Sequence, residues 1–233
     1  MPFDSKTSKT LSFSVLPLLD NFDLNYLSLL RKIGLLNIHY DVMDEFTGTR
    51  GFDTTHLESL KKLGFKVNVH FMVKNISTKL VEFIKYPFDG ISFHVEALTN
   101  VKDGLEYIQF IKNNEKKAGL AFKFDTNFEN YIELISQIDY VTLMSVVPGK
   151  GGQKYNPIVE ENSKKLQELC LKNKISLPIV EFDGGITEIE IQKLWSSGNI
   201  FVSGSWFNNL DFDKKKKLID LIDSNKLWNP FLN

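Results

Sequence analysis

Three segments of the sequence place histidine or acidic side chains inside short apolar runs. They read His-Tyr-Asp at 39–41, Asn-Val-His at 68–70 and Glu-Phe-Asp at 181–183. Side chains two residues apart in a strand share a face, and burying imidazoles and carboxylates is unfavourable unless they pair or bind a metal. A four-ligand set for one divalent ion (zinc, iron(II), manganese or cobalt) is therefore available from His39, Asp41, His70 and Asp183. The alternative is a set of mutually hydrogen-bonded polar residues.

Another pair of the same kind is His94 and Glu96, in the segment Ser-Phe-His-Val-Glu-Ala. Both side chains fall on the inward face if the segment is a strand. We expect them to orient a ligand by hydrogen bonding or to line the pocket floor, rather than to bind the metal directly.

Glycine-bearing turns follow three later apolar runs, at 147–152, 183–185 and 203–205. Glycine lets the backbone approach a ligand closely, and helix N-termini after such turns attract anions. The turns predict a substrate with one phosphate, held by neutral donors. The residues expected there are Gly149, Lys150, Gly151, Gly152, Gly184, Gly185, Gly204 and Ser205.

The elements that must position these residues alternate regularly between strand and helix patterns. The predicted strands are 11–17, 37–43, 66–72, 90–97, 119–125, 140–146, 177–183 and 200–206, and the predicted helices are 22–33, 55–63, 77–86, 102–115, 128–137, 157–172, 187–196 and 213–224. Eight such units in 233 residues predict a closed (β/α)8 TIM barrel, an α/β fold whose chemistry lies at the C-terminal strand ends. No linker divides the chain, so we expect one domain over 1–233. An open doubly wound sheet is the alternative, but its G-x-G-x-x-G signature is absent.

Local signals mark several helix ends. Asp23, Thr54 and Thr187 are predicted N-caps, and Glu190 completes a capping box with Thr187. Gly34, Gly64 and Gly198 stand where a left-handed residue would end a helix.

Composition limits the partners. Lys and Arg number 28 against 29 Asp and Glu, so the net charge of −1 gives no footprint for nucleic acid or a membrane surface. No window approaches 18 consecutive apolar residues, roughly the length of a membrane span, and the first ten residues lack a signal-peptide pattern. We therefore expect a soluble cytoplasmic protein. Cys170 is expected to be a filler rather than a nucleophile, and Lys214–Lys217 a solvated helix face.

The motifs together resemble those of the ribulose-phosphate 3-epimerase family over nearly the whole chain. In order they are Ser14-Val-Leu, His39-Tyr-Asp-Val-Met-Asp44, Val69-His-Phe-Met72, Phe93-His-Val-Glu-Ala97, Leu143-Met-Ser-Val-Val-Pro-Gly-Lys-Gly-Gly-Gln153, Asp183-Gly-Gly-Ile186 and Ser203-Gly-Ser205. The His-x-Asp-Val-Met-Asp and Pro-Gly-x-Gly-Gly-Gln motifs are highly specific to that family and its close sugar-phosphate relatives.

The resemblance implies an enzyme with a (β/α)8 barrel of the ribulose-phosphate-binding type. It would interconvert D-ribulose 5-phosphate and D-xylulose 5-phosphate in the pentose phosphate pathway. Asp41 and Asp183 would act as acid and base and also bind the metal with His39 and His70. Ser14, Met43, Met72 and Met144 would line the reacting end, together with His39 and His70, while the glycine turns receive the phosphate. A homo-oligomer is implied too, because family members form dimers or rings of dimers.

Two segments depart from the family pattern. After His-x-Asp-Val-Met-Asp the family usually continues Gly-x-Phe-Val-Pro-Asn, whereas this chain reads Glu-Phe-Thr-Gly-Thr-Arg-Gly-Phe at 45–52. The family's Leu-Asn-Pro-x-Thr is replaced by Ala-Phe-Lys-Phe-Asp-Thr at 121–126. We expect both segments to shape the pocket wall, and an ion pair between Lys123 and Asp125 is a hypothesis.

Other functions stay open at this point. A hexulose phosphate such as D-allulose 6-phosphate would undergo the same chemistry in a longer pocket, and the altered segments could favour it. A non-catalytic sugar-phosphate-binding paralogue is the other alternative. The decarboxylase and synthase relatives with Asp-x-Lys-x-x-Asp are disfavoured, because the corresponding strand reads Asn-Val-His-Phe-Met at 68–72. The segment 227–232 could close the barrel bottom or meet a neighbouring molecule.

Overall fold

The protein is a closed barrel of eight parallel strands in sequence order, in a computed structural model that describes residues 8–224. The strands are β1 (Thr10–Ser14), β2 (Asn37–Met43), β3 (Lys66–Met72), β4 (Gly90–His94), β5 (Lys117–Phe122), β6 (Tyr140–Met144), β7 (Ile179–Asp183) and β8 (Ile200–Ser203). The barrel closes where β1 pairs with β8. The predicted (β/α)8 fold is therefore confirmed.

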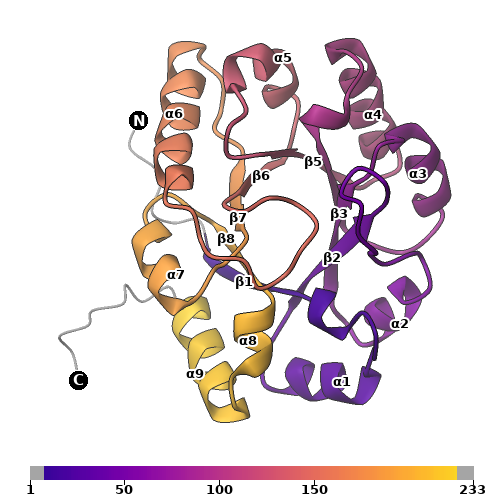
Figure 1. Ribbon diagram of the computed structural model, residues 1–233, viewed down its shortest axis with the longest axis vertical. Coiled ribbons are helices and arrows are strands. Elements are labelled where there is room, and N and C mark those ends of the chain that lie inside the picture. The colour runs from indigo at the N-terminus through magenta and orange to yellow at the C-terminus, as the bar shows by residue number, and fades with distance from the viewer. Residues whose placement is uncertain (1–7, 225–233) are drawn as a thin grey trace.

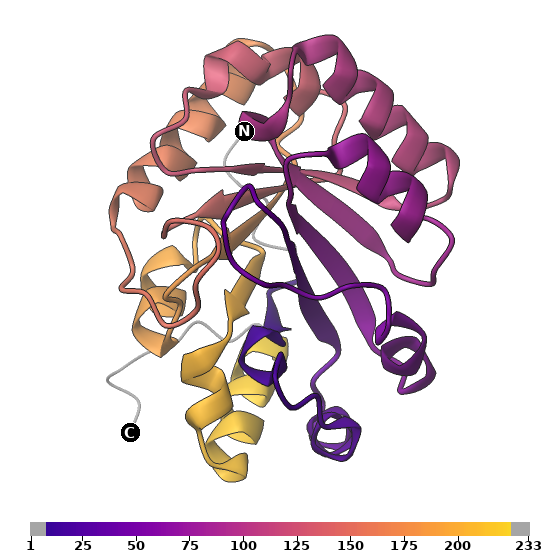
Figure 2. The ribbon, with the colours of Figure 1, turned by 45° about the vertical axis from the view of Figure 1, so that its right-hand side comes forward.

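Helices form a ring around the strands (Figure 1), and Figure 2 shows the same ring after a turn about the vertical axis. The α-helices are α1 (Leu24–Lys32), α2 (Leu57–Lys62), α3 (Ile76–Phe83), α4 (Val101–Asn113), α5 (Ile132–Ile135), α6 (Ile158–Lys172), α7 (Glu188–Leu194), α8 (Ser205–Asn209) and α9 (Phe212–Asp223). Three short 3-10 helices are η1 (Leu16–Leu18), η2 (Val95–Ala97) and η3 (Phe128–Tyr131). That the whole chain 1–233 is a single domain stays a prediction.

Aromatic side chains on the outer faces of the strands hold the helices to the barrel. The ring of Phe13 lies 5.3 Å from that of Phe207 in α8, and Phe71 lies 5.1 Å from Phe83 in α3. These side chains alternate with inward polar ones, as the period of a strand requires. The apolar core consequently lies between strands and helices, while the barrel interior is free to hold polar groups.

The register of the strands brings the motif residues to one rim. Asp41 pairs with His70 and Met43 with Met72 across β2 and β3, and Met144 pairs with Asp183 across β6 and β7. Because all strands are parallel, these positions share the C-terminal end of the barrel, where barrel enzymes carry their chemistry.

Several predicted boundaries were wrong. Strand β4 ends at His94, and 95–97 form a 3-10 turn; β5 ends at Phe122 rather than at 125; and the helix predicted at 128–137 is divided into η3 and α5. The strand predicted at 200–206 ends at Ser203 because Gly204 turns the chain into α8, which the sequence analysis did not predict.

The predicted helix ends agree with the structure at some positions only. Asp23 caps α1, and Thr187 forms the predicted capping box with Glu190. Thr54 does not cap α2, whose N-cap is His56, stacked at 3.8 Å on Phe22.

The three helix-ending glycines differ in conformation. Gly34 and Gly64 have positive φ as predicted. Gly198 does not have a positive φ. A side chain is excluded there for a different reason, because a Cβ would lie 2.7 Å from the ring of Phe182.

Cys170 is buried, as expected of a filler, and burial raises the pKa of its thiol.

The prediction of a solvated helix face at 214–217 was wrong for Lys215, because its side chain is buried and donates to two backbone carbonyls. The segment 227–232 lies outside the described residues.

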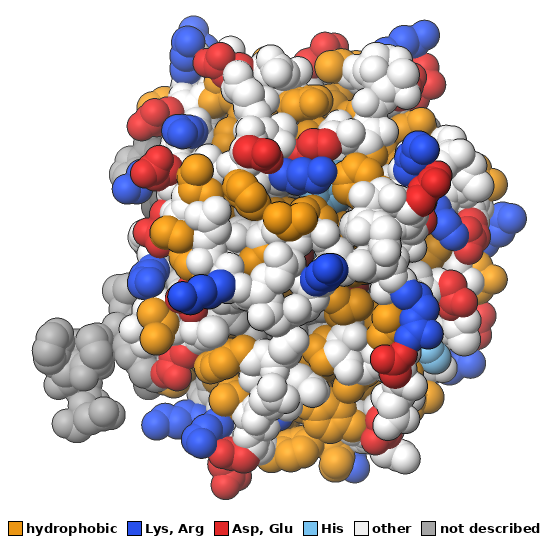
Figure 3. All heavy atoms as spheres, viewed as in Figure 1, with side chains coloured by type: hydrophobic (Ala, Val, Ile, Leu, Met, Phe, Trp, Pro, Cys, Tyr) orange, Lys and Arg blue, Asp and Glu red, His pale blue; other side chains and the backbone are white. Residues whose placement is uncertain are grey.

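The surface shows no single dominant charge on the face viewed in Figure 3, where basic and acidic side chains are interspersed. Among residues 8–224, no helix is long and apolar enough to cross a membrane. The expected absence of a nucleic-acid partner stays a prediction.

Candidate metal centre and its cavity

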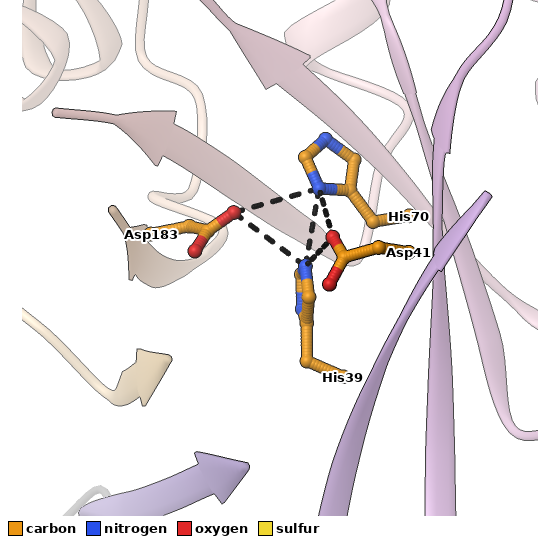
Figure 4. Close-up of side chains that lie close together, drawn as sticks. All are labelled: His39, Asp41, His70 and Asp183. Atoms are coloured by element: carbon orange, nitrogen blue, oxygen red, sulfur yellow. Dashed lines mark hydrogen bonds and ion pairs between the residues drawn. The ribbon is translucent and has the colours of Figure 1, made fainter. Parts of the chain in front are cut away.

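Four side chains from three strands converge at the C-terminal end of the barrel (Figure 4). His39 Nε2 lies 3.1 Å from His70 Nδ1, 3.3 Å from Asp41 Oδ1 and 3.5 Å from Asp183 Oδ2. His70 Nδ1 lies 3.6 Å from Asp41 Oδ1 and 3.5 Å from Asp183 Oδ2. One ligand atom from each of the four lies within 4.8 Å of all the others. The structure thus brings together the four predicted ligands.

These separations suit a divalent ion. Tetrahedral bonds of about 2.0–2.1 Å to nitrogen and oxygen place neighbouring ligand atoms about 3.3 Å apart. The five distances above fall between 3.1 and 3.6 Å. Two imidazoles and two carboxylates also match the mixed donors that zinc, iron(II), manganese and cobalt accept. The residues therefore fit the group that the motifs imply.

The carboxylates of the site favour a positive charge on the two imidazoles at its centre. Burial alone would lower the pKa of His39, but the three surrounding carboxylates raise it to about 10. The pKa of His70 is also raised, because hydrogen bonds to Asp183 and Asp41 outweigh its burial. Burial alone would raise the pKa of Asp41, yet the two imidazoles hold it well below its usual range. The site therefore binds protons tightly when it holds no cation.

A histidine and a carboxylate, His94 and Glu96, support His70 from outside the cluster. His94 Nε2 lies 3.1 Å from His70 Nε2, and Glu96 Oε2 lies 2.9 Å from His94 Nδ1. The predicted hydrogen bond from this pair to one of the four candidate metal ligands is present, and the ligand is His70. Burial lowers the pKa of His94 to about 4, whereas hydrogen bonds lower the pKa of Glu96 to about 2 despite its burial.

Glu181 lies beneath the cluster and is buried completely. Its Oε1 accepts a hydrogen bond of 2.8 Å from Thr142 and lies 3.6 Å from His39 Nδ1. Burial raises the pKa of Glu181. Although Glu181 was on the inward face by alternation, the sequence analysis assigned it no role.

Asp41 and Asp183 each place one carboxylate oxygen near His39 Nε2. Both residues also line an adjoining cavity of about 750 Å³. The second oxygen of Asp41, Oδ2, accepts a hydrogen bond of 2.6 Å from Ser14. The predicted residues that line the same cavity are Ser14, Met43, Met72, Met144, Gly149, Lys150, Gly151, Gly152, Gly184, Gly185, Gly204 and Ser205. His39 and His70, which the resemblance implied at the substrate, do not line it; they are buried below.

The cavity wall includes residues that the sequence analysis missed. They include Leu16, Pro17, Val146, Gln153, Tyr155, Ile186, Lys193 and Trp206. Gln153 ends the Pro-Gly-x-Gly-Gly-Gln motif, and its side chain donates to the carbonyls of Val147 and Lys150. Its place in the motif was the available signal. The others lie on η1, on loops and on α7 and α8, where strand alternation gives no information.

The glycine turns are packed too closely for side chains. Gly184 and Gly185 have φ of +107° and +62°; a Cβ on Gly184 would lie 2.4 Å from Val146, and one on Gly185 would lie 2.6 Å from the backbone nitrogen of Tyr155. The loops after β6 and β7 are therefore held against each other. Their backbone can approach a ligand closely, as the predicted phosphate site requires.

Neither divergent segment supplies a residue to the lining of this cavity, but 45–52 packs behind its wall. Thr49 donates a hydrogen bond to the sulfur of Met43, and a Cβ on Gly149 would lie 2.6 Å from Thr47.

The Lys123–Asp125 ion pair, by contrast, is absent from the described residues. Lys123 follows the end of β5, and its ammonium lies over the ring of Phe46 at 4.6 Å. Alternation does not extend beyond the strand, which is why the pairing failed.

The fold and the cluster define a class: a (β/α)8-barrel protein with a candidate metal centre at the C-terminal mouth. The sequence profile described as the ribulose-phosphate 3 epimerase family matches residues 10–208. The chain belongs to the ribulose-phosphate 3-epimerase family.

Two relatives illustrate the match. The chain is 42% identical over 211 residues to the ribulose-phosphate 3-epimerase of Mycoplasma genitalium, covering 90% of this chain and 97% of the relative. It is 31% identical over 188 residues to the enzyme of the same name from Escherichia coli K12, covering 78% and 80%.

More distant solved structures share the barrel. A Mycobacterium tuberculosis tryptophan synthase structure matches with a TM-score of 0.63 at 9% identity, covering 97% of this chain and 95% of that one. An HpcH/HpaI aldolase from Desulfitobacterium hafniense matches with a TM-score of 0.63 at 11% identity, covering 97% of each chain. At such identities the likeness concerns the fold alone.

Proposed function

We propose that the protein interconverts D-ribulose 5-phosphate and D-xylulose 5-phosphate by inverting carbon 3. The observation that carries this proposal is the placement of Asp41 and Asp183. They come from strands β2 and β7, turn one oxygen each to the cluster and line the same cavity. Two carboxylates on different sides of one cavity are what an epimerisation by two proton transfers needs.

The reaction removes a weakly acidic proton beside a ketone and returns one to the opposite face. One carboxylate accepts the carbon-3 proton, giving a planar enediolate, and the other carboxylic acid donates its proton from the other side. In the reverse direction the roles exchange. Ser14 donates to Oδ2 of Asp41 and thereby holds that carboxylate in a defined orientation.

A divalent cation held by His39, Asp41, His70 and Asp183 would supply positive charge that stabilises the enediolate oxygens. Met43, Met72 and Met144 line the cavity beside the two carboxylates. Their thioethers exclude water and do not compete for protons. The glycine turns receive the phosphate with backbone N–H groups.

Two alternatives are weighed against this proposal. Preference for D-allulose 6-phosphate was suggested by the segments 45–52 and 121–126, which supply no residue to the cavity lining, although 45–52 packs behind Met43 and Gly149. A non-catalytic paralogue is disfavoured because all four ligand atoms converge. We further expect one metal ion per chain, action in the cytoplasm within the pentose phosphate pathway, and a homo-oligomer; each is part of this proposal.

The test is to incubate the protein with D-ribulose 5-phosphate in deuterated buffer and follow the carbon-3 proton by NMR. We expect exchange with formation of D-xylulose 5-phosphate, abolished by a chelator. Asp41→Asn and Asp183→Asn should each slow turnover by at least about 10²-fold, the size of a general acid–base contribution.

Asp213→Asn is the control, because Asp213 is exposed and belongs to neither the cluster nor the cavity. It should retain the wild-type rate. Exchange that survives in both Asp41→Asn and Asp183→Asn would overturn the two-carboxylate assignment. Exchange of D-allulose 6-phosphate alone would transfer the activity to the hexulose phosphate.

A further inference from the structure

A chain of hydrogen bonds runs from the cluster to the loop after β5. We propose that His94 and Glu96 are positioning residues, which make His70 present the unprotonated Nδ1 to a metal, and that the segment 123–126 holds Glu96 in place. This inference rests on the proposed metal site and deepens it. His94 is fully buried, and Glu96 is mostly buried.

The positions of the protons along this series of hydrogen bonds follow from the Glu96 end. A carboxylate only accepts hydrogen bonds, so the contact of 2.9 Å between Glu96 Oε2 and His94 Nδ1 places a proton on Nδ1. A neutral imidazole has one N–H, so Nε2 of His94 is an acceptor. The contact of 3.1 Å to His70 must then use the proton on Nε2 of His70. A neutral His70, the form that binds a metal, then keeps its lone pair on Nδ1.

Glu96 is itself anchored by the divergent segment. Its Oε1 accepts hydrogen bonds from the backbone N–H of Lys123, at 2.9 Å, and from the hydroxyl of Thr126. These two donors occupy Oε1 and leave Oε2 for His94. The segment that departs from the family pattern thus fixes the orientation of the carboxylate.

The other divergent segment covers the same chain of contacts. The centroid of the Phe46 ring lies 5.4 Å from that of the His94 ring, and the ammonium of Lys123 lies 4.6 Å from the centroid of the Phe46 ring. Neither segment lines the substrate cavity. The contacts of the first segment with His94 and of the second with Glu96 indicate that the departures remodel the support of His70.

The first measurement is the tautomer of His94, read from ring-nitrogen NMR spectra of histidine-labelled protein with and without zinc. We expect the proton on Nδ1 in both states. In Glu96→Gln, whose amide can either donate or accept, a mixture of the two tautomers should appear. Thr126→Val should move the spectrum in the same direction by a smaller amount. Glu106→Gln, an exposed charge on α4, is the control and should leave the spectrum unchanged.

The second measurement is zinc affinity, obtained by competition with a chromophoric chelator. Loss of such an outer partner weakens metal binding by about 10–100-fold. We expect this in Glu96→Gln and in His94→Leu. His94→Gln restores an oxygen acceptor near the original Nε2 and should recover part of the affinity, which a role in packing alone would not predict.

The outcomes separate the two proposals. A wild-type His94 protonated on Nε2, or an unchanged tautomer and affinity in Glu96→Gln, overturns the positioning role. A wild-type protein that binds no zinc overturns the metal site proposed above, and the positioning role toward the metal is overturned with it. Normal zinc binding and normal His94 spectra without epimerase activity would contradict the proposed reaction while supporting the positioning residues.

Discussion

Lys215 directs its ammonium group into the protein, although three lysines of the same run, 214–217, are its neighbours. The group donates to the carbonyls of Asn208, at the end of α8, and of Leu210, between α8 and α9, and lies over the ring of Phe207 at 5.6 Å. It therefore ties the end of one helix to the start of the next. Composition could not reveal this, because the partners are backbone atoms of a helix that the sequence pattern did not predict.

We expect Lys215→Met to lower the free energy of unfolding by about 1–3 kcal/mol, since methionine keeps the apolar length but removes the donor to two partly buried carbonyls. Urea unfolding measures this change. Lys216→Met is the matched control: its partner Asp220 is exposed and four residues away, so about 0.3–0.5 kcal/mol is expected. Equal losses in both variants would mean that the contacts of Lys215 contribute nothing particular.

Metal binding should release protons near neutral pH. The pKa of His39 is raised to about 10, so its Nε2 is protonated at pH 7 when the site holds no metal. The metal needs that lone pair, so affinity should fall as pH falls, by about tenfold per pH unit for each proton displaced. Calorimetric titration with zinc in two buffers of different ionisation heat counts the protons. Identical heats in the two buffers would contradict the prediction.

At the scale of the elements, the glycine turn after β7 offers a controlled test. Gly185 and Gly48 have similar φ, +62° and +67°, so alanine at either should cost about 1–2 kcal/mol of backbone strain. A Cβ at Gly48 meets nothing within 4 Å, whereas one at Gly185 lies 2.6 Å from a backbone nitrogen of the neighbouring loop. Only Gly185→Ala should displace the two loops of the cavity wall.

We therefore expect Gly185→Ala to raise KM for the sugar phosphate by tenfold or more, because about 1.4 kcal/mol of lost binding is a factor of ten. Gly48→Ala should leave KM within about twofold. Steady-state kinetics and urea unfolding of both variants check the prediction. A similar rise of KM in both variants would assign the effect to strain alone and would remove the argument for close packing at Gly185.

The strands were predictable and some of their ends were not. Strand alternation placed His39 and Asp41 on one face, and the pairing of β2 with β3 brings His70 beside Asp41. Beyond a strand, alternation stops: β5 ends at Phe122, and the predicted partner of Lys123 was wrong for that reason. Loop residues such as Tyr155 and Trp206 line the cavity through long-range packing, which one sequence does not encode in any local pattern.

At the scale of the whole molecule, the number of strand–helix units predicted a closed barrel, and closure places residues far apart in sequence at one site. Asp41 and Asp183 meet through His39 and His70 although 142 residues separate them in the chain. The types of the four ligands were readable from motifs. The supporting role of His94 and Glu96 was readable as well. Which ligand they contact was not, because the distance between His94 and His70 depends on the tilt and stagger of the closed sheet.

Because the four ligands come from strands β2, β3 and β7, a bound ion ties distant parts of the barrel together and should stabilise the entire fold. A ligand at 100 times its Kd, bound to the folded state alone, adds about 2.7 kcal/mol. For a domain of this size that corresponds to a rise in Tm of about 5–10 °C. Scanning calorimetry with zinc, compared with chelator-treated protein, measures the shift. In Asp183→Asn, which removes one ligand, the shift should shrink to a small fraction. A full shift in that variant would mean that zinc stabilises the protein from a different site.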